Sequence, residues 1–249
     1  MWRRHFNVMA LGSAVTGFLG LRTAAADQGV ISSTGQGLEG DIWSSGPTRR
    51  NKTQPGAVPP PGSAPAAAIL VVGDSLSAEY GIARGTGWVS LLAMKLRAER
   101  PDLQVVNASI SGDTTAGGRS RLPAALAQVR PALVVIELGG NDALRGLDLN
   151  SSQQNLEAMI EASRAMNARV VLVGMQVPPN YGPDYSAKFS AMFANLAKKH
   201  RTGLVPFFLQ GIADRPDATQ LFQPDRIHPR EEAHPRMLAN VWPEIKKQL

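Results

Sequence analysis

The chain has 249 residues, of which 43% are hydrophobic, and it carries 24 glycines, 18 prolines and a formal net charge of +6. This composition supplies enough apolar material for one sizeable core. Because cysteine is absent, the sequence excludes disulfides, thiolate metal sites, a cysteine nucleophile and a lipid-modified N-terminal cysteine. Nucleic-acid binding calls for a concentrated basic stripe, whereas the cations here form only short pairs. We therefore expect no nucleic-acid partner.

The first 26 residues have the pattern of a signal peptide. Arg3 and Arg4 form a charged head, residues 9–21 are largely apolar, and residues 24–26 are the small alanines that a signal peptidase reads. The apolar run is too short to span a bilayer as a mature helix. We therefore expect export to the periplasm or beyond, without stable membrane insertion after cleavage. The paired arginines resemble a twin-arginine signal, and an ordinary secretory signal is the alternative.

Residues 27–66 differ in composition from the C-terminal part of the chain. They are rich in serine, glycine and proline and show little apolar periodicity, with Trp43 as a lone large aromatic residue. Such a segment cannot bury enough surface to offset its ordering entropy, so we interpret it as a flexible linker.

The remainder, residues 67–249, alternates between strand-like and helix-like patterns. Five short, almost continuously apolar runs are typical of strands buried on both faces of a parallel sheet; they cover residues 68–72, 103–106, 132–136, 170–173 and 204–207. The intervening apolar residues recur at helical spacing and predict core-facing stripes. The four stripes are Trp88, Leu91, Leu92 and Leu96; Leu156, Met159 and Ile160; Phe189, Met192, Phe193 and Leu196; and Met237, Leu238, Val241 and Ile245. This alternation predicts a three-layer α/β/α domain with a five-stranded parallel sheet, similar to flavodoxin.

Polar clusters follow these predicted strands, at the edge where parallel α/β proteins place their functional residues. Ser75 comes directly after the first strand. At a strand-to-helix turn, its hydroxyl is presented at the sheet edge near a helix N-terminus, which suits a nucleophile. The segment is not the Gly-x-Ser-x-Gly elbow, because position 77 is serine. A simple Asp/Ser helix cap fits the same residues.

The next two clusters contain candidate hydrogen-bond donors. Gly112 follows the second strand, where a missing Cβ lets the backbone N–H approach a ligand. Asn141 follows the third strand after two glycines, so its side-chain amide can lie at the sheet edge. On local grounds alone, an ordinary turn and an Asx-type turn fit these residues equally well.

The last cluster holds Asp225 and His228, three positions apart. On a tight loop, this spacing can set the carboxylate against one imidazole nitrogen and leave the other facing outward. Glu231, Glu232 and His234 lie close by, but they lack the spacing of the usual zinc-binding helices. We therefore expect no metal.

Taken together, these clusters resemble the SGNH (GDSL) hydrolase superfamily. Ser75, Gly112, Asn141 and His228 occur in the order of its four motif blocks, each beyond a predicted strand. The segments that carry the resemblance further, toward the branch of periplasmic arylesterases and multifunctional acyl-thioesterase/lysophospholipases, are residues 73–78, 107–114, 137–142, 179–182 and 205–208. The resemblance covers residues 67–249 and none of the linker.

The resemblance implies a role for each motif residue. Ser75 would attack the acyl carbonyl, with His228 as general base and acid and Asp225 as the group that orients and stabilises the imidazole. The backbone N–H groups of Ser75 and Gly112, with the Asn141 side chain, would form the oxyanion hole. No cofactor is implied, and the partner would be a small acyl ester or thioester.

The acyl side of the cleft is expected on two neighbouring loops. Leu144 follows Asn141, and Val177 and Pro178 follow the fourth predicted strand. The matching loops in the resembling branch bind acyl chains, whereas the alternative is that these residues only cover the sheet. Arg226, between Asp225 and His228, departs from the small or neutral residues that are common there.

Two other functions are compatible with the same scaffold. A deacetylase of acetylated polysaccharide would reuse this machinery, but it would usually expose several aromatic residues for sugar stacking, and this chain is only 6% aromatic. A non-catalytic acyl- or glycan-binding module would be expected to lack one of the motif residues, and all are present. The oligomeric state is left open by the sequence.

Overall fold

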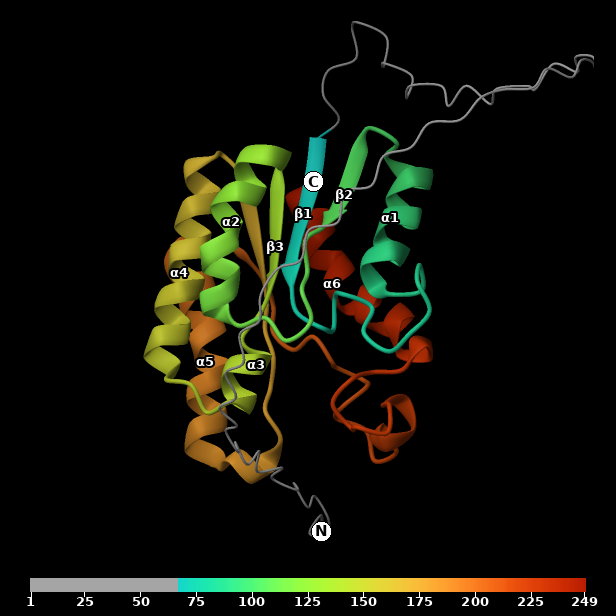
Figure 1. Cartoon of the computed structure of the whole chain (residues 1–249), viewed down its shortest axis with the longest axis vertical. Helices are drawn as coiled ribbons and strands as arrows, with labels where there is room; N and C mark the ends of the chain where they lie inside the picture. Colours follow the sequence, from blue (N-terminus) through green and yellow to red (C-terminus); the bar gives the residue numbers. More distant parts are fainter. Residues whose placement is uncertain (1–66) are drawn as a thin grey trace, which may run out of the picture. The chain divides into compact units, whose positions relative to one another are not determined.

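The computed structural model describes residues 67–249, and the signal peptide and linker expected in residues 1–66 lie outside them. Within the described residues, the protein forms three layers, with a sheet between two groups of helices (Figure 1). This architecture confirms the predicted three-layer α/β/α fold.

The central layer is a five-stranded sheet in the order β2-β1-β3-β4-β5, and every pairing between neighbours is parallel. Its strands are β1 (Ala67–Gly73), β2 (Leu103–Asn107), β3 (Leu133–Glu137), β4 (Arg169–Val173) and β5 (Gly203–Val205). All five residues of β3 are buried, as the apolar run predicts. The expectation of burial on both faces was wrong for β2. It lies at the edge of the sheet, and only Leu103 of its five residues is buried.

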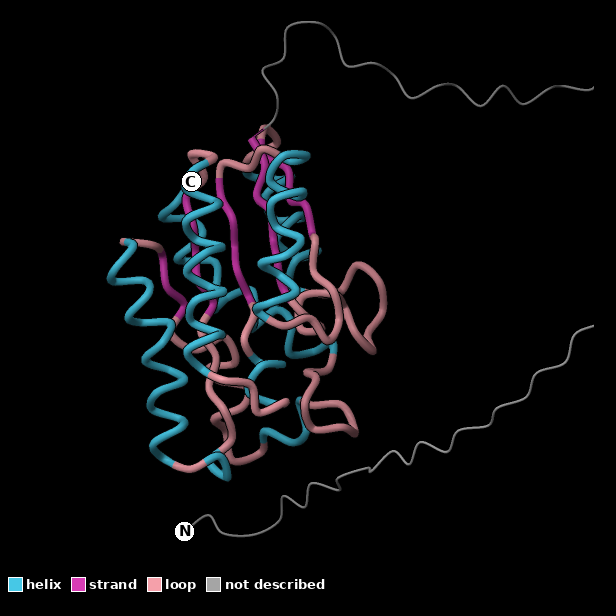
Figure 2. Tube along the Cα trace, turned by 60° about the vertical axis from the view of Figure 1, so that its left-hand side comes forward, coloured by secondary structure: helices cyan, strands magenta, loops and turns pink. Residues whose placement is uncertain are grey.

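Helices cover both faces of the sheet. On one face, α1 (Trp88–Glu99) packs against α6 (His234–Gln248); on the other, α2 (Thr115–Val129) and α5 (Pro183–His200) flank α4 (Leu149–Ala165) (Figures 1 and 2). The shorter elements are α3 (Gly140–Leu144) and the 3₁₀ segments Pro179–Tyr181, Ala218–Leu221 and Glu231–Ala233.

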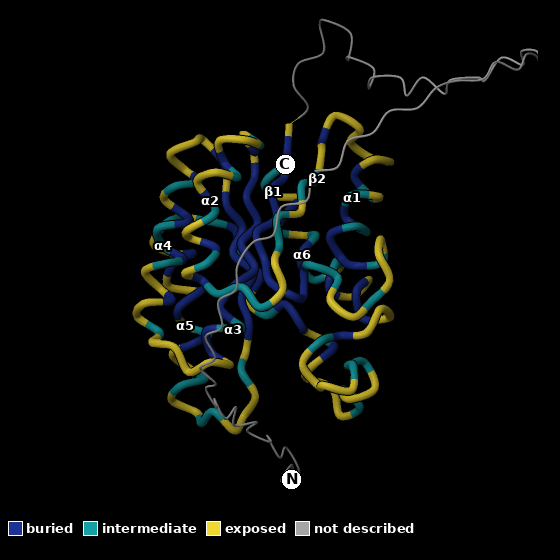
Figure 3. The backbone as a smooth tube through the Cα atoms, in the orientation of Figure 1, coloured by how far each residue is buried: buried dark blue, intermediate teal, exposed yellow. Residues whose placement is uncertain are grey.

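The helical stripes predicted from apolar spacing face the sheet, and the outer sides of the helices are exposed (Figure 3). Phe189, Met192, Phe193 and Leu196 of α5 are all buried, which confirms the clearest stripe. In α1 and α6, Leu91 and Leu238 are only partly buried, because they lie at the margins of their stripes. None of the helices in residues 67–249 combines the length and apolarity that crossing a membrane requires.

The topology brings the polar clusters to one edge of the sheet. Because β1, β2 and β3 are parallel neighbours, their carboxyl ends at Gly73, Asn107 and Glu137 lie on the same side. Residues that are far apart in sequence can therefore meet beyond this edge.

Candidate active site

Ser75, His228 and Asp225 form a continuous hydrogen-bonded chain of side chains. His228 Nε2 lies 2.9 Å from Ser75 Oγ, and His228 Nδ1 lies 2.6 Å from Asp225 Oδ2. The two ring nitrogens therefore contact different groups, as the spacing of Asp225 and His228 predicts. A proton on Nδ1, donated to the carboxylate, leaves Nε2 free to accept the serine hydroxyl proton.

The loop that carries the imidazole is shaped by Asp225 itself. Its Oδ1 accepts hydrogen bonds from the backbone N–H groups of Ile227 and His228, each at 3.0 Å. Partial burial acts to raise the pKa of Asp225, but the hydrogen bonds from the His228 side chain and from these backbone groups outweigh it and hold that pKa below its usual range. Asp225 is therefore ionised at neutral pH.

Tyr80 packs against the imidazole, a contact that no local sequence pattern indicates. Its ring centroid lies 4.3 Å from that of His228, with the planes inclined by 39°. The Gln223 side chain joins the two loops, because its Nε2 donates to the carbonyl groups of Tyr80 and Pro229. These contacts restrict the orientation of the imidazole.

The segment that carries Ser75 differs from the expected strand-to-helix turn. Helix α1 begins only at Trp88, and residues 75–80 form turns. The Ala78 N–H donates to the Asp74 carbonyl, which closes one helical turn, but Glu79 has φ 59° and cannot continue a right-handed helix. The prediction of a regular helix N-terminus beside Ser75 was therefore wrong. Asp74 Oδ1 instead accepts from the Leu76 N–H at 3.0 Å and caps the single turn.

Glycines at positive φ shape the segments that carry two of the predicted oxyanion donors, Gly112 and Asn141. Gly112 has φ 78° and Gly139, which precedes α3, has φ 117°, conformations that favour glycine. Asn141 lies in the first turn of α3 rather than in an Asx-type turn, and its amide donates to Asp74 Oδ2 at 3.0 Å. Across residues 67–249, the hydrogen bonds leave the backbone N–H groups of Ser75 and Gly112 without an acceptor.

Hydrogen bonds of Arg145 and Asp142 tie α3 and the residue that follows it to Gly112, to the start of α2 and to α4. Arg145 Nη2 donates to the Gly112 carbonyl at 2.7 Å. The buried Asp142 carboxylate accepts from the backbone N–H and hydroxyl of Thr115, at the start of α2, and from the Ser152 hydroxyl. These contacts fix two of the donor-bearing segments relative to each other. A buried aspartate could be suspected from the sequence, but its partners on other elements could not.

The three residues predicted for the acyl side differ in exposure. Leu144, at the end of α3, is 50% exposed. Pro178 is exposed as well, whereas Val177 is partly buried and packs against the core. Their part in binding an acyl chain stays a prediction.

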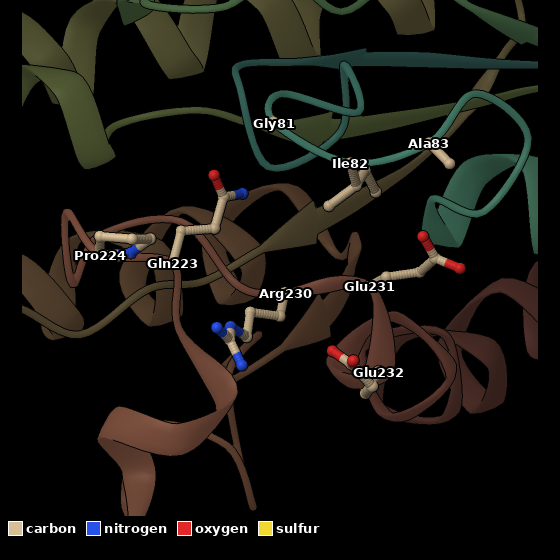
Figure 4. A pocket seen from close by; sticks show the side chains of 8 residues that line it. All are labelled: Gly81, Ile82, Ala83, Gln223, Pro224, Arg230, Glu231 and Glu232. Atoms are coloured by element: carbon tan, nitrogen blue, oxygen red, sulfur yellow. The ribbon is translucent and has the colours of Figure 1, made fainter.

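An open pocket of about 370 Å³ adjoins the loop that carries Asp225 and His228. Figure 4 shows its walls, which are formed by residues 81–83, Gln223, Pro224 and residues 230–232. Its charged lining residues are Arg230, Glu231 and Glu232. None of the predicted acyl-binding residues lines it, so this pocket is distinct from the predicted acyl groove.

His234, one of the residues considered as possible metal ligands, has another partner. His234 is buried at the start of α6, where its Nδ1 accepts the Trp88 backbone N–H at 3.1 Å at the first turn of α1. Burial lowers the pKa of His234 to about 4, so it is neutral and suited to accept this bond. In the described part of the chain, Glu157, Glu161 and His200 come close enough to hold an ion, but Lys199 lies 2.6 Å from Glu157 Oε1.

Comparison with known proteins identifies the family. The sequence model of the GDSL-like lipase/acylhydrolase family matches residues 71–236. The chain is 53% identical to the esterase TesA of Pseudomonas aeruginosa over 186 residues, which are 75% of this chain and 91% of TesA. It is 42% identical to thioesterase 1/protease 1/lysophospholipase L1 of Escherichia coli over 173 residues, 70% of this chain and 80% of that protein.

Solved structures of esterases resemble this fold as well. The crystal structure of TesA matches with a TM-score of 0.70 over 73% of this chain and 99% of that chain. The psychrotrophic esterase EstA from Pseudoalteromonas, in a structure inhibited by monoethylphosphonate, is 42% identical and matches with a TM-score of 0.67 over 72% of this chain and 97% of that chain. This protein therefore belongs to the GDSL-like lipase/acylhydrolase family and is an ester hydrolase.

Proposed function

We propose that this protein is an exported esterase that cleaves carboxylic esters and thioesters through an acyl-enzyme on Ser75. The observation that carries this proposal is the alignment of Ser75 Oγ, the two ring nitrogens of His228 and the Asp225 carboxylate, at 2.9 Å and 2.6 Å. These three hydrogen-bonded side chains supply a nucleophile, a base and the group that orients the base.

The geometry supports a two-step reaction. Ser75 Oγ attacks the acyl carbonyl carbon while His228 Nε2 takes the hydroxyl proton, and the ionised Asp225 stabilises the imidazolium that forms. His228 then returns the proton to the oxygen or sulfur of the leaving group as the bond to the carbonyl carbon breaks. In the second step, His228 deprotonates a water molecule whose oxygen attacks the acyl carbonyl carbon. The bond from that carbon to Ser75 Oγ then breaks, His228 returns the proton to Oγ, and the carboxylic acid leaves.

The charge that develops on the carbonyl oxygen needs donors. The backbone N–H groups of Ser75 and Gly112 have no acceptor within residues 67–249, so both are available to an oxyanion. The Asn141 amide carries a second N–H besides the one donated to Asp74. Donors that are held in place before the reaction stabilise the transition state without reorganisation.

The substrate class is proposed from the relatives. One is named an esterase, another an arylesterase, and a third a thioesterase and lysophospholipase. We infer that aryl esters, acyl-thioesters and lysophospholipids are substrates of this chain. Rates measured on p-nitrophenyl esters, an acyl-thioester and an acetylated polysaccharide test this inference. Turnover of the polysaccharide alone would establish the deacetylase function instead.

The proposed acyl groove predicts a chain-length dependence. Each further buried methylene adds up to about 0.8 kcal/mol of transition-state binding, or about fourfold in kcat/KM, until the groove is full. We expect kcat/KM to rise from acetyl to butyryl p-nitrophenyl esters. Replacing Leu144 by aspartate should flatten this rise, because a charge then borders the acyl chain.

Met166→Asp provides the control for the groove. Met166 is 45% exposed, similar to Leu144, but it follows α4 and lies at the amino ends of the strands, away from Ser75. Its substitution should leave the chain-length dependence intact. Equal dependence in Leu144→Asp and in the unmodified protein would show that Leu144 only covers the sheet.

Export is proposed from the N-terminal pattern. The protein recovered from its native host should begin near Asp27 and lie outside the cytoplasm. Replacing Arg3 and Arg4 by lysines should block export if the twin-arginine route is used and leave it unchanged for an ordinary secretory route. N-terminal sequencing of the protein in each cell fraction provides the measurement, and a cytoplasmic full-length chain in healthy cells would contradict export.

A further inference from the structure

Two buried carboxyl groups that the triad does not use lie behind the nucleophile. Asp74 is 3% exposed and Glu137 is 2% exposed. Asp74 directly precedes Ser75, and Glu137 ends β3, where it is the register partner of Gly73 on β1. Because burial of a carboxyl is costly unless it is paired, the contacts of these two residues need an explanation.

The Glu137 carboxyl group accepts hydrogen bonds from Ser77 and from the Asp74 backbone. Trp88 Nε1 donates to Ser77 Oγ at 3.1 Å, and the Ser77 hydroxyl donates to Glu137 Oε2 at 2.7 Å. The Asp74 backbone N–H points to the same oxygen at 3.4 Å. A Cβ on Gly73 would lie 2.8 Å from this oxygen, so the first glycine of the motif makes room for Glu137.

The Asp74 carboxylate accepts hydrogen bonds from Leu76 and Asn141. Its Oδ1 accepts the Leu76 N–H, and its Oδ2 accepts the Asn141 amide, each at 3.0 Å. The Asp74 backbone N–H lies 3.4 Å from Glu137 Oε2, and the Asp74 charge raises the pKa of Glu137. Asp74 therefore links the buried Glu137 directly to a proposed oxyanion donor.

Both carboxyl groups have raised pKa values. Burial raises the pKa of Asp74 to about 6, against the hydrogen bonds from Leu76 and Asn141, which favour its ionised form. Burial, together with the nearby Asp74 charge, raises the pKa of Glu137 well above its usual range. Two adjacent carboxyls cannot both ionise cheaply, and the hydrogen bonds from Leu76 and Asn141 favour the charge on Asp74.

We propose that Glu137 and Asp74 are positioning residues: protonated Glu137 holds the Asp74 carboxylate, and Asp74 turns the Asn141 amide so that its second N–H faces the oxyanion. An amide held only by solvent could rotate and present its oxygen instead. The inference rests on the proposed function, since it assigns Asn141 to the oxyanion hole.

A double-mutant cycle between Asp74→Asn and Asn141→Ala tests the link. Asp74→Asn should lower kcat by roughly 10- to 100-fold, less than loss of the Asn141 donor itself, with little change in KM. In the Asn141→Ala background, the same substitution should change kcat by less than about threefold, because coupled residues are non-additive. An equal loss of kcat in both backgrounds would overturn the proposal.

Glu137 is tested by a neutral isostere. Glu137→Leu should lower kcat at least tenfold, and Glu137→Gln should restore most of it, because the glutamine amide donates to Asp74 as the protonated acid does. If kcat is no higher with glutamine than with leucine, the assignment of the proton to Glu137 is wrong. If leucine prevents folding, the Gln variant decides by itself: a tenfold or greater loss of kcat in it overturns the proposal.

The pH dependence of stability tests the charge assigned to Asp74. The pKa of Asp74 in the fold is about 6, above the ordinary 3.8, so the folded state binds the proton more tightly and loses stability as pH rises through this window. Asp74→Asn lacks this loss, and its melting temperature, relative to the unmodified protein, should be higher at pH 8 than at pH 4. The titratable groups that face Asp74 are His228 and Asp113, and Asp113 is paired with Arg121 of α2. The opposite trend in melting temperature would overturn the assigned charge.

Fluorophosphonate labelling of Ser75 in each variant keeps the two proposals apart. If the unmodified protein is not labelled at Ser75, the proposed function fails. If Ser75 is labelled but Asp74→Asn lowers kcat equally in the unmodified and Asn141→Ala backgrounds, only the positioning inference fails.

Discussion

Replacing Ser75 by alanine is expected to lower kcat for a p-nitrophenyl ester by several orders of magnitude, roughly 10⁶-fold where the triad acts as a unit. The physical reason is that no acyl-enzyme can form without the hydroxyl that lies 2.9 Å from His228 Nε2. The rate that remains would come from the oxyanion donors and from substrate binding.

The control for this substitution is Ser120→Ala, on the exposed side of α2, which should leave kcat within about twofold of the unmodified protein because surface changes are usually small. A fluorophosphonate probe should label the Ser120 variant and fail to label the Ser75 variant. Labelling at a different serine, located by mass spectrometry of the peptides, would remove Ser75 from the proposed mechanism.

Asn141→Ala is expected to have the second-largest effect, a loss of roughly 100- to 1,000-fold in kcat with little change in KM. The amide acts on the charge that exists only in the transition state, so its removal weakens ground-state binding far less. The substitution also leaves the buried Asp74 without one donor. Steady-state kinetics on a short-chain ester, measured above KM, provides the test.

Asn150→Ala is a matched control, since Asn150 is an exposed asparagine in the first turn of α4. It should leave both kinetic constants within about twofold. An effect of Asn141→Ala that is confined to KM would mean that Asn141 binds the substrate rather than the oxyanion.

Much of the fold could be predicted because its signals are local. Five apolar runs alternating with helical stripes are sufficient to predict a parallel sheet between two helical layers. The errors arose where local pattern does not specify position in the sheet. The run in β2 contains Val105 and Val106, yet β2 pairs on one side only and is half-exposed. After β1, the sequence favoured a helix, but Glu79 at φ 59° ends the turn, and its carboxylate accepts hydrogen bonds from the Gly85 and Gly87 N–H groups of the following loop.

The amino-acid pattern is enough to place the candidate groups at the reactive edge of the sheet, because a parallel strand pattern puts the following loop at a known end. It also predicts the contact between Asp225 and His228, which are three residues apart. The other partners of these groups depend on the tertiary structure. His228 meets Ser75 across 153 positions, and Glu137 meets Ser77 across 60. Such pairings depend on strand order and register, which bring distant residues to hydrogen-bonding distance only once the whole sheet has formed.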